Sequence, residues 1–341
     1  MSFLESHLTG SVPPSPAVAA RMRYCLLADG IANPLDTGAQ SSPRNFAGPW
    51  PWAYAVHFGI IAPDEAEPHF DTFCDMEELR GLGFVGPILP KMNQVYKVTH
   101  FTVTQHWLIA ALSPSAATRK RAAKQAVHLR ALLLADSILS PVPWKGSSRA
   151  IGWCAQGLQL DHAATGDTDA LAGSRTVLLR MQAAHGTEGG VPFLWRNPNA
   201  LTDPNHVYEC SPWMDSLACK ALAREVASGG DAARPLLLHG LRGLAYAQRE
   251  DGTFHDDYQP GQPGVFHEAP GESTETWIWP ALHAAKAALD DEWPVWGETM
   301  LGRCHDRYLA LNRFKPGDSG FRDQHNMSIA IACVSAWDWR D

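Results

Sequence analysis

Six apolar helical segments recur along this chain roughly every 50–60 residues, and this repeat restricts the possible folds more than any other feature. Each segment follows a loop rich in Gly, Pro, aromatic and polar residues. A helix that is apolar on all sides has to be buried, whereas an amphipathic helix covers a core with one face. The apolar segments begin near residues 52, 100, 149, 212, 274 and 327.

A more polar, amphipathic helix is expected beside each apolar one, at 16–30, 71–80, 114–137, 169–184, 231–248 and 293–311. Strand signals are few, so the predicted class is all-α. Six buried helices that each pair with an outer helix close naturally into a ring, an (α/α)6 toroid, and the alternative is an open α-solenoid. We predict a single domain over residues 1–341, with residues 1–15 as a loose N-terminal arm.

The predicted ring also predicts the place of the functional site. All inner helices of such a ring run parallel, so their N-termini and the preceding loops open on one face. Unsatisfied N–H groups and the positive ends of the helix dipoles point there as well. The same loops hold most of the Trp, His and Tyr residues. We therefore expect the loops before the inner helices to meet at one pocket.

The segment Asp203-Pro-Asn-His-Val-Tyr-Glu-Cys-Ser-Pro-Trp-Met-Asp215 concentrates reactive side chains at one of these junctions. Ser211 suits the N-cap and Pro212 suits the first turn of the apolar helix that follows. The polar cluster is therefore expected at or just before a helix N-terminus.

Four residues are the candidate catalytic groups. Tyr208 and His206 could act as proton donor and acceptor, or could only brace the loop by hydrogen bonds. Cys210 could be an activated thiol at a helix N-terminus, or a buried inert one. His325, before the sixth apolar segment, could serve in acid/base chemistry or as a cap.

The substrate-binding candidates are mainly aromatic. The chain has 13 tryptophans, and rings near Gly/Pro loops could stack on a sugar, enclose an isoprenoid or belong to the core. Arg149 is a candidate cation beside the Tyr208 phenolate, and Glu275 could instead be a helix cap. The candidates are Trp52, His100, Trp144, Arg149, Trp153, Trp195, Trp213, Glu275 and Trp277.

Composition narrows the class of partner. The net charge of −8 and a pI near 6.0 argue against nucleic acid. Seven scattered cysteines without a CxxC pair suit a reducing compartment. The N-terminal residues do not resemble a secretory signal, and no stretch suits a membrane span, so we expect a soluble, cytoplasmic protein. Without a Walker loop, dinucleotide fingerprint or HExxH motif, we expect no metal or cofactor and a small-molecule substrate.

Part of the chain resembles the C-terminal half of the unsaturated glucuronyl hydrolases. The matching segments are Arg149-Ala-Ile-Gly-Trp-Cys154, Asp203-Pro-Asn-His-Val-Tyr-Glu-Cys-Ser211 and Ala221-Leu-Ala-Arg-Glu225. The resemblance implies an (α/α)6 fold and action on uronides. In that family the catalytic acid comes from an aspartate-bearing loop, and the corresponding loop here, 140–148, holds no aspartate.

Two further resemblances point to similar folds. Gln248-Arg-Glu-Asp-Gly-Thr-Phe254 with Ser273-Thr-Glu-Thr-Trp277 resembles one repeat of the squalene-hopene-type cyclases. Trp144-Lys-Gly-Ser147 and Glu209-Cys-Ser-Pro212 resemble segments of linalool dehydratase-isomerase, in which Cys210 matches a functional position. These resemblances imply a lyase, hydratase or cyclase acting on an isoprenoid.

The functional expectation is therefore an enzyme that performs acid/base chemistry in an aromatic funnel. The first reading is a carbohydrate-active lyase or hydrolase acting on a small saccharide or uronide. The alternatives are an enzyme of isoprenoid alcohols and a non-catalytic binding protein. A funnel lined with Arg, Lys and Trp suits sugars, whereas one lined with Trp, Phe, Met and Cys suits isoprenoids.

Overall fold

The computed structural model describes residues 16–27, 50–79, 95–135, 148–196, 210–267 and 275–311, and this part of the chain is mainly helical. The predicted all-α class is confirmed. The α-helices are α2 (Pro16–Leu27), α4 (Trp50–His57), α5 (Pro63–Leu79), α6 (Val95–Leu112), α7 (Ala116–Ala135), α8 (Ser148–Thr165), α9 (Thr168–Ala184), α10 (Pro212–Ala227), α11 (Arg234–Ala247), α12 (Glu275–Leu289) and α13 (Val295–Leu311).

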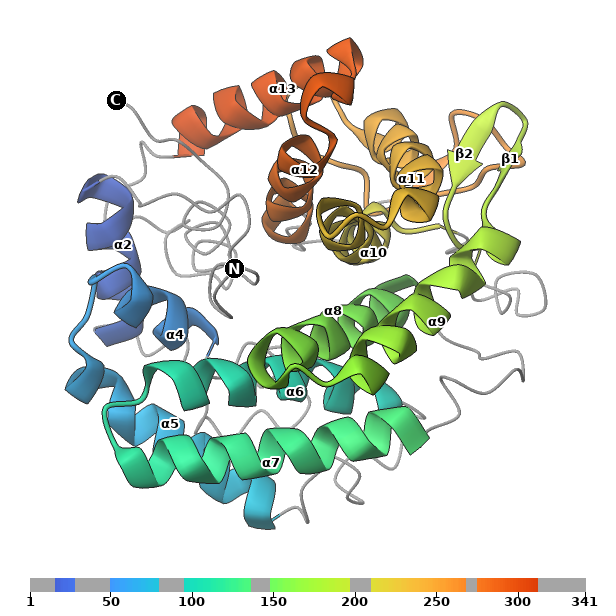
Figure 1. Cartoon of the computed structure of the whole chain (residues 1–341). Helices are drawn as coiled ribbons and strands as arrows, with labels where there is room; N and C mark the ends of the chain where they lie inside the picture. The colour runs from blue at the N-terminus through green and yellow to red at the C-terminus, as the bar shows by residue number, and fades with distance from the viewer. Residues whose placement is uncertain are drawn as a thin grey trace.

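The helices alternate between an inner and an outer position. Helix α10 packs between α8 and α12, α8 also packs on α6, and α6 packs on α4. Figure 1 shows these five helices following one another around a curve, with α5, α7, α9, α11 and α13 on its outer side. The apolar segments predicted at 52, 100, 149, 212 and 274 are the inner helices. The segment predicted at 327 and the arm 1–15 lie outside the described residues.

The first outer helix after α4 starts earlier than the predicted residue 71. Helix α5 begins at Pro63, and its first turn contains Asp64 and Glu65. The Glu65 carboxylate accepts the Ala62 N–H at 2.7 Å and pairs with Arg23 of α2 at 2.8 Å. A proline at the first position and acidic residues that oppose the helix dipole favour this start.

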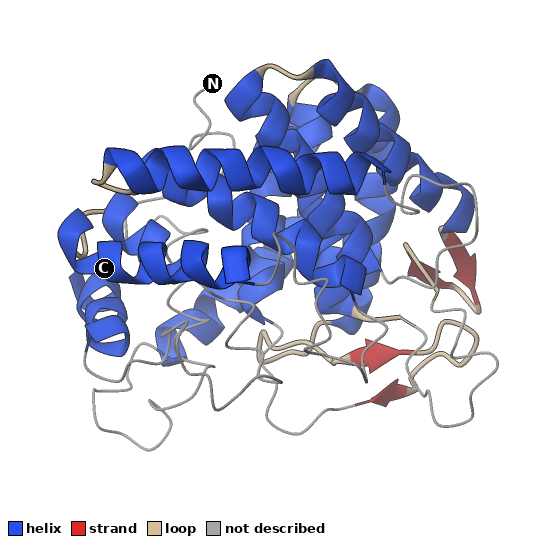
Figure 2. Ribbon diagram, turned by 90° about the horizontal axis from the view of Figure 1, so that it is seen from below, coloured by secondary structure: helices blue, strands red, loops and turns tan. Residues whose placement is uncertain are grey.

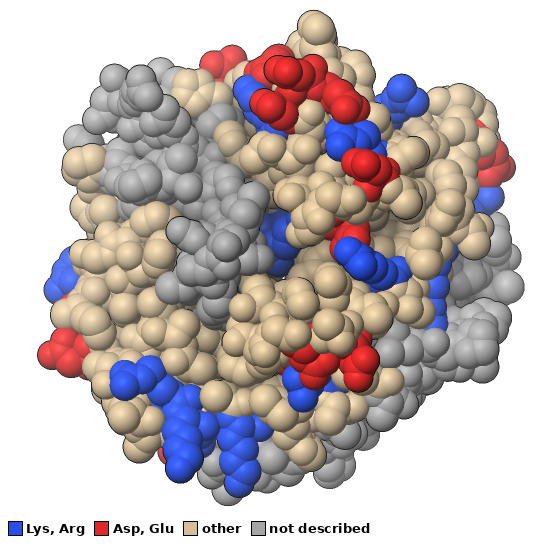
Figure 3. Space-filling model, viewed as in Figure 1, with Lys and Arg blue, Asp and Glu red and all other residues tan. Residues whose placement is uncertain are grey.

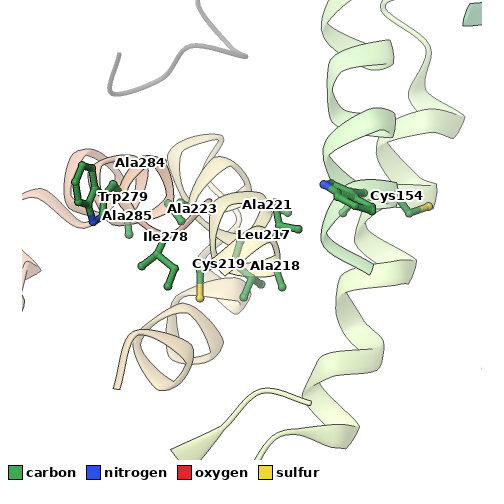
Figure 4. Packing of buried hydrophobic residues seen from close by; sticks show 14 of the residues in the cluster. Cys154, Leu217, Ala218, Cys219, Ala221, Ala223, Ile278, Trp279, Ala284 and Ala285 are labelled. Carbon is green, nitrogen blue, oxygen red and sulfur yellow. The ribbon is translucent and has the colours of Figure 1, made fainter. Parts of the chain in front are cut away.

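Small residues allow the inner helices to pack closely. A Cβ at Gly152 of α8 would lie only 2.5 Å from the backbone of Leu217 and Ala218 in α10. Figure 4 shows Leu217 and Ala218 on the side of α10 that faces α8, while Ala223 lies next to Ile278 of α12. One continuous hydrophobic core joins these helices.

Side-chain amides reinforce the same contact between α8 and α10. The Gln156 and Gln159 Nε2 groups donate to the carbonyl oxygens of Leu217 and Ala221, at 2.8 and 2.9 Å. Both glutamines are buried, so these bonds satisfy groups that would otherwise destabilise the interior.

Two short antiparallel strand pairs interrupt the helical pattern. Strands β1 (Gly186–Glu188) and β2 (Val191–Phe193) follow α9, and β3 (Asp257–Tyr258) and β4 (Phe266–His267) follow α11. Gly189 and Gly190 both have positive φ, which suits a two-residue hairpin turn. Figure 2 shows the strands confined to one side of the helical body.

Short 3₁₀ turns lie at Asp231–Ala233, before α11, and at Asp290–Glu292, before α13. Among the described helices, none combines the length and apolar character needed to cross a membrane.

The close contact of α8 with α10 gives a stability prediction. Gly152→Ala should lower the free energy of unfolding by about 2 kcal/mol or more, because the added methyl group forces two backbones apart. Gly302→Ala on α13 is the matched control, since nothing lies within 4 Å of the added carbon. That change should stabilise the protein by about 0.5–1 kcal/mol, as expected for Gly to Ala in a helix. Chemical denaturation of both variants measures the difference, and equal effects would contradict this packing.

Candidate functional site

A buried carboxyl group, Asp215, lies in the first turn of α10 and is 1% exposed. Its side chain accepts hydrogen bonds from the Ser148 hydroxyl, at the start of α8, and from the backbone N–H of Leu194, which follows β2. The Oδ1 atom is buried and has no hydrogen-bond partner in the described structure. An unsatisfied buried carboxylate oxygen is costly, so this atom is a candidate to meet a ligand or a proton.

The segment that precedes α10 is fixed to the β3 strand. Cys210 and Tyr258 exchange two backbone hydrogen bonds, at 3.2 and 2.9 Å. The Ser211 hydroxyl donates to the Asp256 carbonyl oxygen at 3.0 Å. This pairing places Asp257 of β3, and Asp256 before it, beside the start of α10.

Burial and a second carboxylate set the ionisation of Asp215. Its pKa is raised to about 7, mainly by burial and to a smaller extent by the neighbouring Asp257, while the bonds from Ser148 and Leu194 act in the opposite direction. At neutral pH the group is therefore poised between donating and accepting a proton. We refer to Asp215, Asp257, Ser148 and the Leu194 N–H as the Asp215 site.

The Tyr258 hydroxyl lies next to this site. Burial raises its pKa well above the usual value, as do the charges of Asp215 and the thiol of Cys210. The hydroxyl donates to the Pro192 carbonyl oxygen at 2.9 Å. Tyr258 therefore stays protonated and ties β3 to β2 above the start of α10.

A second group of polar residues lies on another side of α10. Cys219 faces α11, where its Sγ approaches Gly240, and the carbonyl oxygens of Leu217 and Ala221 face α8. With 100° between successive residues, Trp213, Lys220 and Arg224 turn away from α11. We refer to these three residues as the inner face of α10.

The inner face carries two buried basic side chains. Lys220 and Arg224 are each 5% exposed, and Trp213 is partly buried. Arg224 lies close enough to Tyr54 of α4 for its charge to oppose the rise that burial causes in the pKa of Tyr54. The side chains of the inner face therefore point towards α4. Figure 3 shows Lys or Arg atoms recessed near the middle of this side of the molecule.

Three predicted site residues lie at or near the Asp215 site or the inner face of α10. Cys210 is 2% exposed and packs with Tyr258. Trp195 follows Leu194 and is partly buried, and its Nε1 has no hydrogen-bond partner in the described structure. Trp213 belongs to the inner face of α10.

The other predicted residues lie elsewhere or outside the description. Trp52 is buried and stacks on His69 of α5, with 3.7 Å between ring centroids. Trp153 is 7% exposed within the core of α8. His100, Arg149, Glu275 and Trp277 lie in α6, α8 and α12, but their side chains are outside the described part; His206, Tyr208, Trp144 and His325 lie wholly outside it.

Sequence reasoning missed Asp215, Lys220 and Arg224. One signal could have found them: all three are charged residues inside a helix that is otherwise apolar. Such residues are rarely buried without a partner or a function. The described part holds no group of three or more His, Cys, Asp or Glu residues placed to bind a metal ion.

No protein-family model, curated protein or solved structure matches this chain. Any proposal about function therefore depends on the chemistry of the Asp215 site and of the inner face of α10.

The raised pKa of Asp215 predicts how stability depends on pH. Its folded pKa of about 7 exceeds the ordinary 3.8, so the folded state binds more protons between these values. The contribution of Asp215 to stability is therefore full below about pH 4 and falls as pH rises to about 7, by about 4 kcal/mol in all.

Asp215→Asn should remove this pH-dependent contribution to the free energy of unfolding. The variant should therefore gain stability relative to the wild type as pH rises. Urea unfolding at several pH values measures the difference. Asp306→Asn, at an exposed position on α13, is the control and should keep the wild-type profile. A pH-independent difference between Asp215→Asn and the wild type would contradict the assignment.

Proposed function

We propose that this protein is an enzyme that performs acid/base chemistry on a small polar substrate, with a saccharide or uronide as the favoured class. The observation that carries the proposal is Asp215, a buried carboxyl with a pKa of about 7 and an oxygen without a partner. A general acid or base works best when its pKa is near the working pH. Hydrolysis and elimination of a glycosidic bond both need such a group at the leaving oxygen.

Asp257 is the proposed partner of Asp215. Two neighbouring carboxylates do not ionise independently, so one keeps its proton while the other is charged. This division provides an acid and a base in one place, as in many enzymes that cleave glycosidic bonds. The pair supports either a hydrolase or a lyase.

The segment 206–210 is the proposed source of further proton-transfer groups. Two backbone bonds to Tyr258, the residue that follows Asp257, hold Cys210 against β3. His206 and Tyr208 precede Cys210 by four and two residues. We retain them as candidate catalytic residues, with Arg149 as a candidate cation.

The inner face of α10 favours a polar substrate over an isoprenoid. A lysine and an arginine beside a tryptophan are typical of sites that hold sugars and their acids, whereas a hydrocarbon chain gains nothing from buried cations. The isoprenoid enzyme and the binding protein remain possible outcomes of the tests below.

We also propose that the chain closes into the (α/α)6 toroid, with 327–337 as the sixth inner helix. The alternation of five inner and five outer helices supports this proposal, since one more inner helix between α12 and α4 would complete a ring. A chain truncated after Leu311 should then lose cooperative unfolding or melt far below the full chain, because the faces of α4 and α12 would be exposed. Near-identical calorimetric melting of the two chains would favour the open solenoid.

A substrate screen combined with Asp215→Asn tests the proposed chemistry. The panel contains neutral disaccharides, saturated and unsaturated uronic disaccharides, and isoprenoid alcohols. Oxygen-18 from solvent water marks hydrolysis, and absorbance of a new conjugated double bond marks elimination. Asp215→Asn should lower kcat by about 100-fold or more, because general acid/base catalysis contributes about that much. Tyr208→Phe should likewise lose turnover if its hydroxyl transfers a proton.

Asp306→Asn is the matched control and should keep full activity, and all variants should melt cooperatively. Full activity of Asp215→Asn would refute its role. Turnover of isoprenoid alcohols alone would establish the alternative enzyme class, and binding of a sugar without any turnover would indicate a binding protein.

A further inference from the structure

Two histidine rings meet where α9 ends and the β1–β2 hairpin begins. His185 is the C-cap residue of α9 and directly precedes β1, and His239 lies on α11. Figure 1 shows β1 and β2 beside α11, near the end of α9. The ring centroids are 5.0 Å apart, and the ring planes meet edge to face at 80°. Both residues are half-buried, so the pair lies at the surface and not in the core.

A backbone carbonyl group engages one nitrogen of each ring. The His185 Nδ1 lies 3.1 Å from the Met181 carbonyl oxygen, and the His239 Nε2 lies 2.7 Å from the carbonyl oxygen of Gly186. A carbonyl oxygen only accepts hydrogen bonds, so each of these nitrogens carries the ring proton. In the neutral rings the remaining nitrogens, Nε2 of His185 and Nδ1 of His239, therefore each present a lone pair. Neither makes a hydrogen bond in the described part of the chain.

The arrangement of the two rings is the one that histidines usually have when they bind a metal ion. A ligating imidazole nearly always donates its second N–H to a carbonyl or carboxylate group, which fixes its tautomer and orientation. Two imidazoles on one tetrahedral Zn²⁺, at Zn–N distances of about 2.0–2.1 Å, have ring centroids about 5 Å apart. The separation of His185 and His239 matches this value. Both the tautomers and the spacing therefore suit a shared ion.

We propose that His185 and His239 together bind one divalent metal ion, with Zn²⁺ as the expected ion. Imidazole nitrogen suits Zn²⁺, Cu²⁺ and Ni²⁺, whereas Mg²⁺ and Ca²⁺ prefer oxygen ligands. The described residues provide no third His, Cys, Asp or Glu ligand, so water completes the coordination. The site has half the protein ligands of a structural zinc site, and its Kd should be on the order of 10–100 μM.

A metal ion bound here would act on the β1–β2 hairpin. Gly186, whose carbonyl oxygen accepts from His239, pairs with Phe193 across the hairpin. Leu194 follows Phe193, and its N–H binds Asp215. The ion would join the end of α9 to α11 and so restrain the strand that leads to Leu194. The proposal does not depend on the proposed function, because it concerns the binding of an ion and not turnover.

Titration calorimetry of the full chain with ZnCl₂ tests the proposal. The protein is first stripped with a chelator, which is then removed by dialysis. We expect one Zn²⁺ to bind at the affinity given above and MgCl₂ to give no binding. Pulsed EPR with Cu²⁺ in place of Zn²⁺ detects the remote nitrogen of each coordinated imidazole, and it should report two imidazoles on one ion.

His185→Gln and His239→Gln each remove one ligand. Glutamine keeps an N–H that can donate to a carbonyl oxygen, so the hairpin should stay in place. Each variant should bind Zn²⁺ at least about tenfold more weakly, because only one imidazole remains. His128→Gln, at an exposed position on α7, is the control and should bind as the wild type does. The EPR result is a property of the wild-type protein, so it tests the proposal even if a variant does not fold.

Four results would overturn the proposal: no binding of Zn²⁺ at millimolar concentration, unchanged affinity in His185→Gln or His239→Gln, an equal loss in His128→Gln, or a single imidazole in the EPR spectrum. Failure here is distinct from failure of the proposed function. Asp215→Asn should bind Zn²⁺ as the wild type does, and His185→Gln leaves the Asp215 carboxyl in place.

Discussion

The contact between α8 and α10 is the interaction on which the rest of the structure depends. Because Gly152 has no side chain, the backbones of α8 and α10 pack closely together at this residue. Gln156 and Gln159 donate hydrogen bonds to carbonyl oxygens of α10. With α12 and α11 on its other sides, α10 is buried over nearly its whole length. A helix in that position exposes almost none of its side chains to water, whatever their polarity.

The burial of α10 explains why its polar residues have unusual chemistry. Asp215, Lys220 and Arg224 would be ordinary charged groups on an outer helix such as α7. Inside the protein, water no longer stabilises their charged forms, so the acid becomes weaker and the bases become weaker. Their ionisation therefore responds to any ligand that brings a charge or excludes more water. The fold thus produces reactive groups by position, without a metal cluster in the described residues.

The sequence predicted the helices much better than the site. A buried helix can be predicted from a continuous apolar stretch, which is a local property of the sequence. Five of the six predicted segments correspond to the inner helices. The predicted start of α5 was wrong because Pro63-Asp64-Glu65 resembles a loop in the sequence. In the structure the Glu65 carboxylate accepts the Ala62 N–H and these residues form the first turn of the helix. The partners of Asp215 are Ser148, Leu194 and Asp257, which no local pattern brings together. Cys210 was recognised because it lies in a cluster of reactive residues, whereas Asp215, in the same segment, resembled the acidic residue of an ordinary first helical turn.

The positions of the two groups on α10 restrict any ligand that uses both. Asp215 and Lys220 are separated by five residues, or about 7.5 Å along the helix axis, and they point to different sides. One small molecule cannot touch both through the body of the helix. The Asp215 site and the inner face of α10 are therefore separate places in the structure, and a ligand bound at one of them would not have to touch the other.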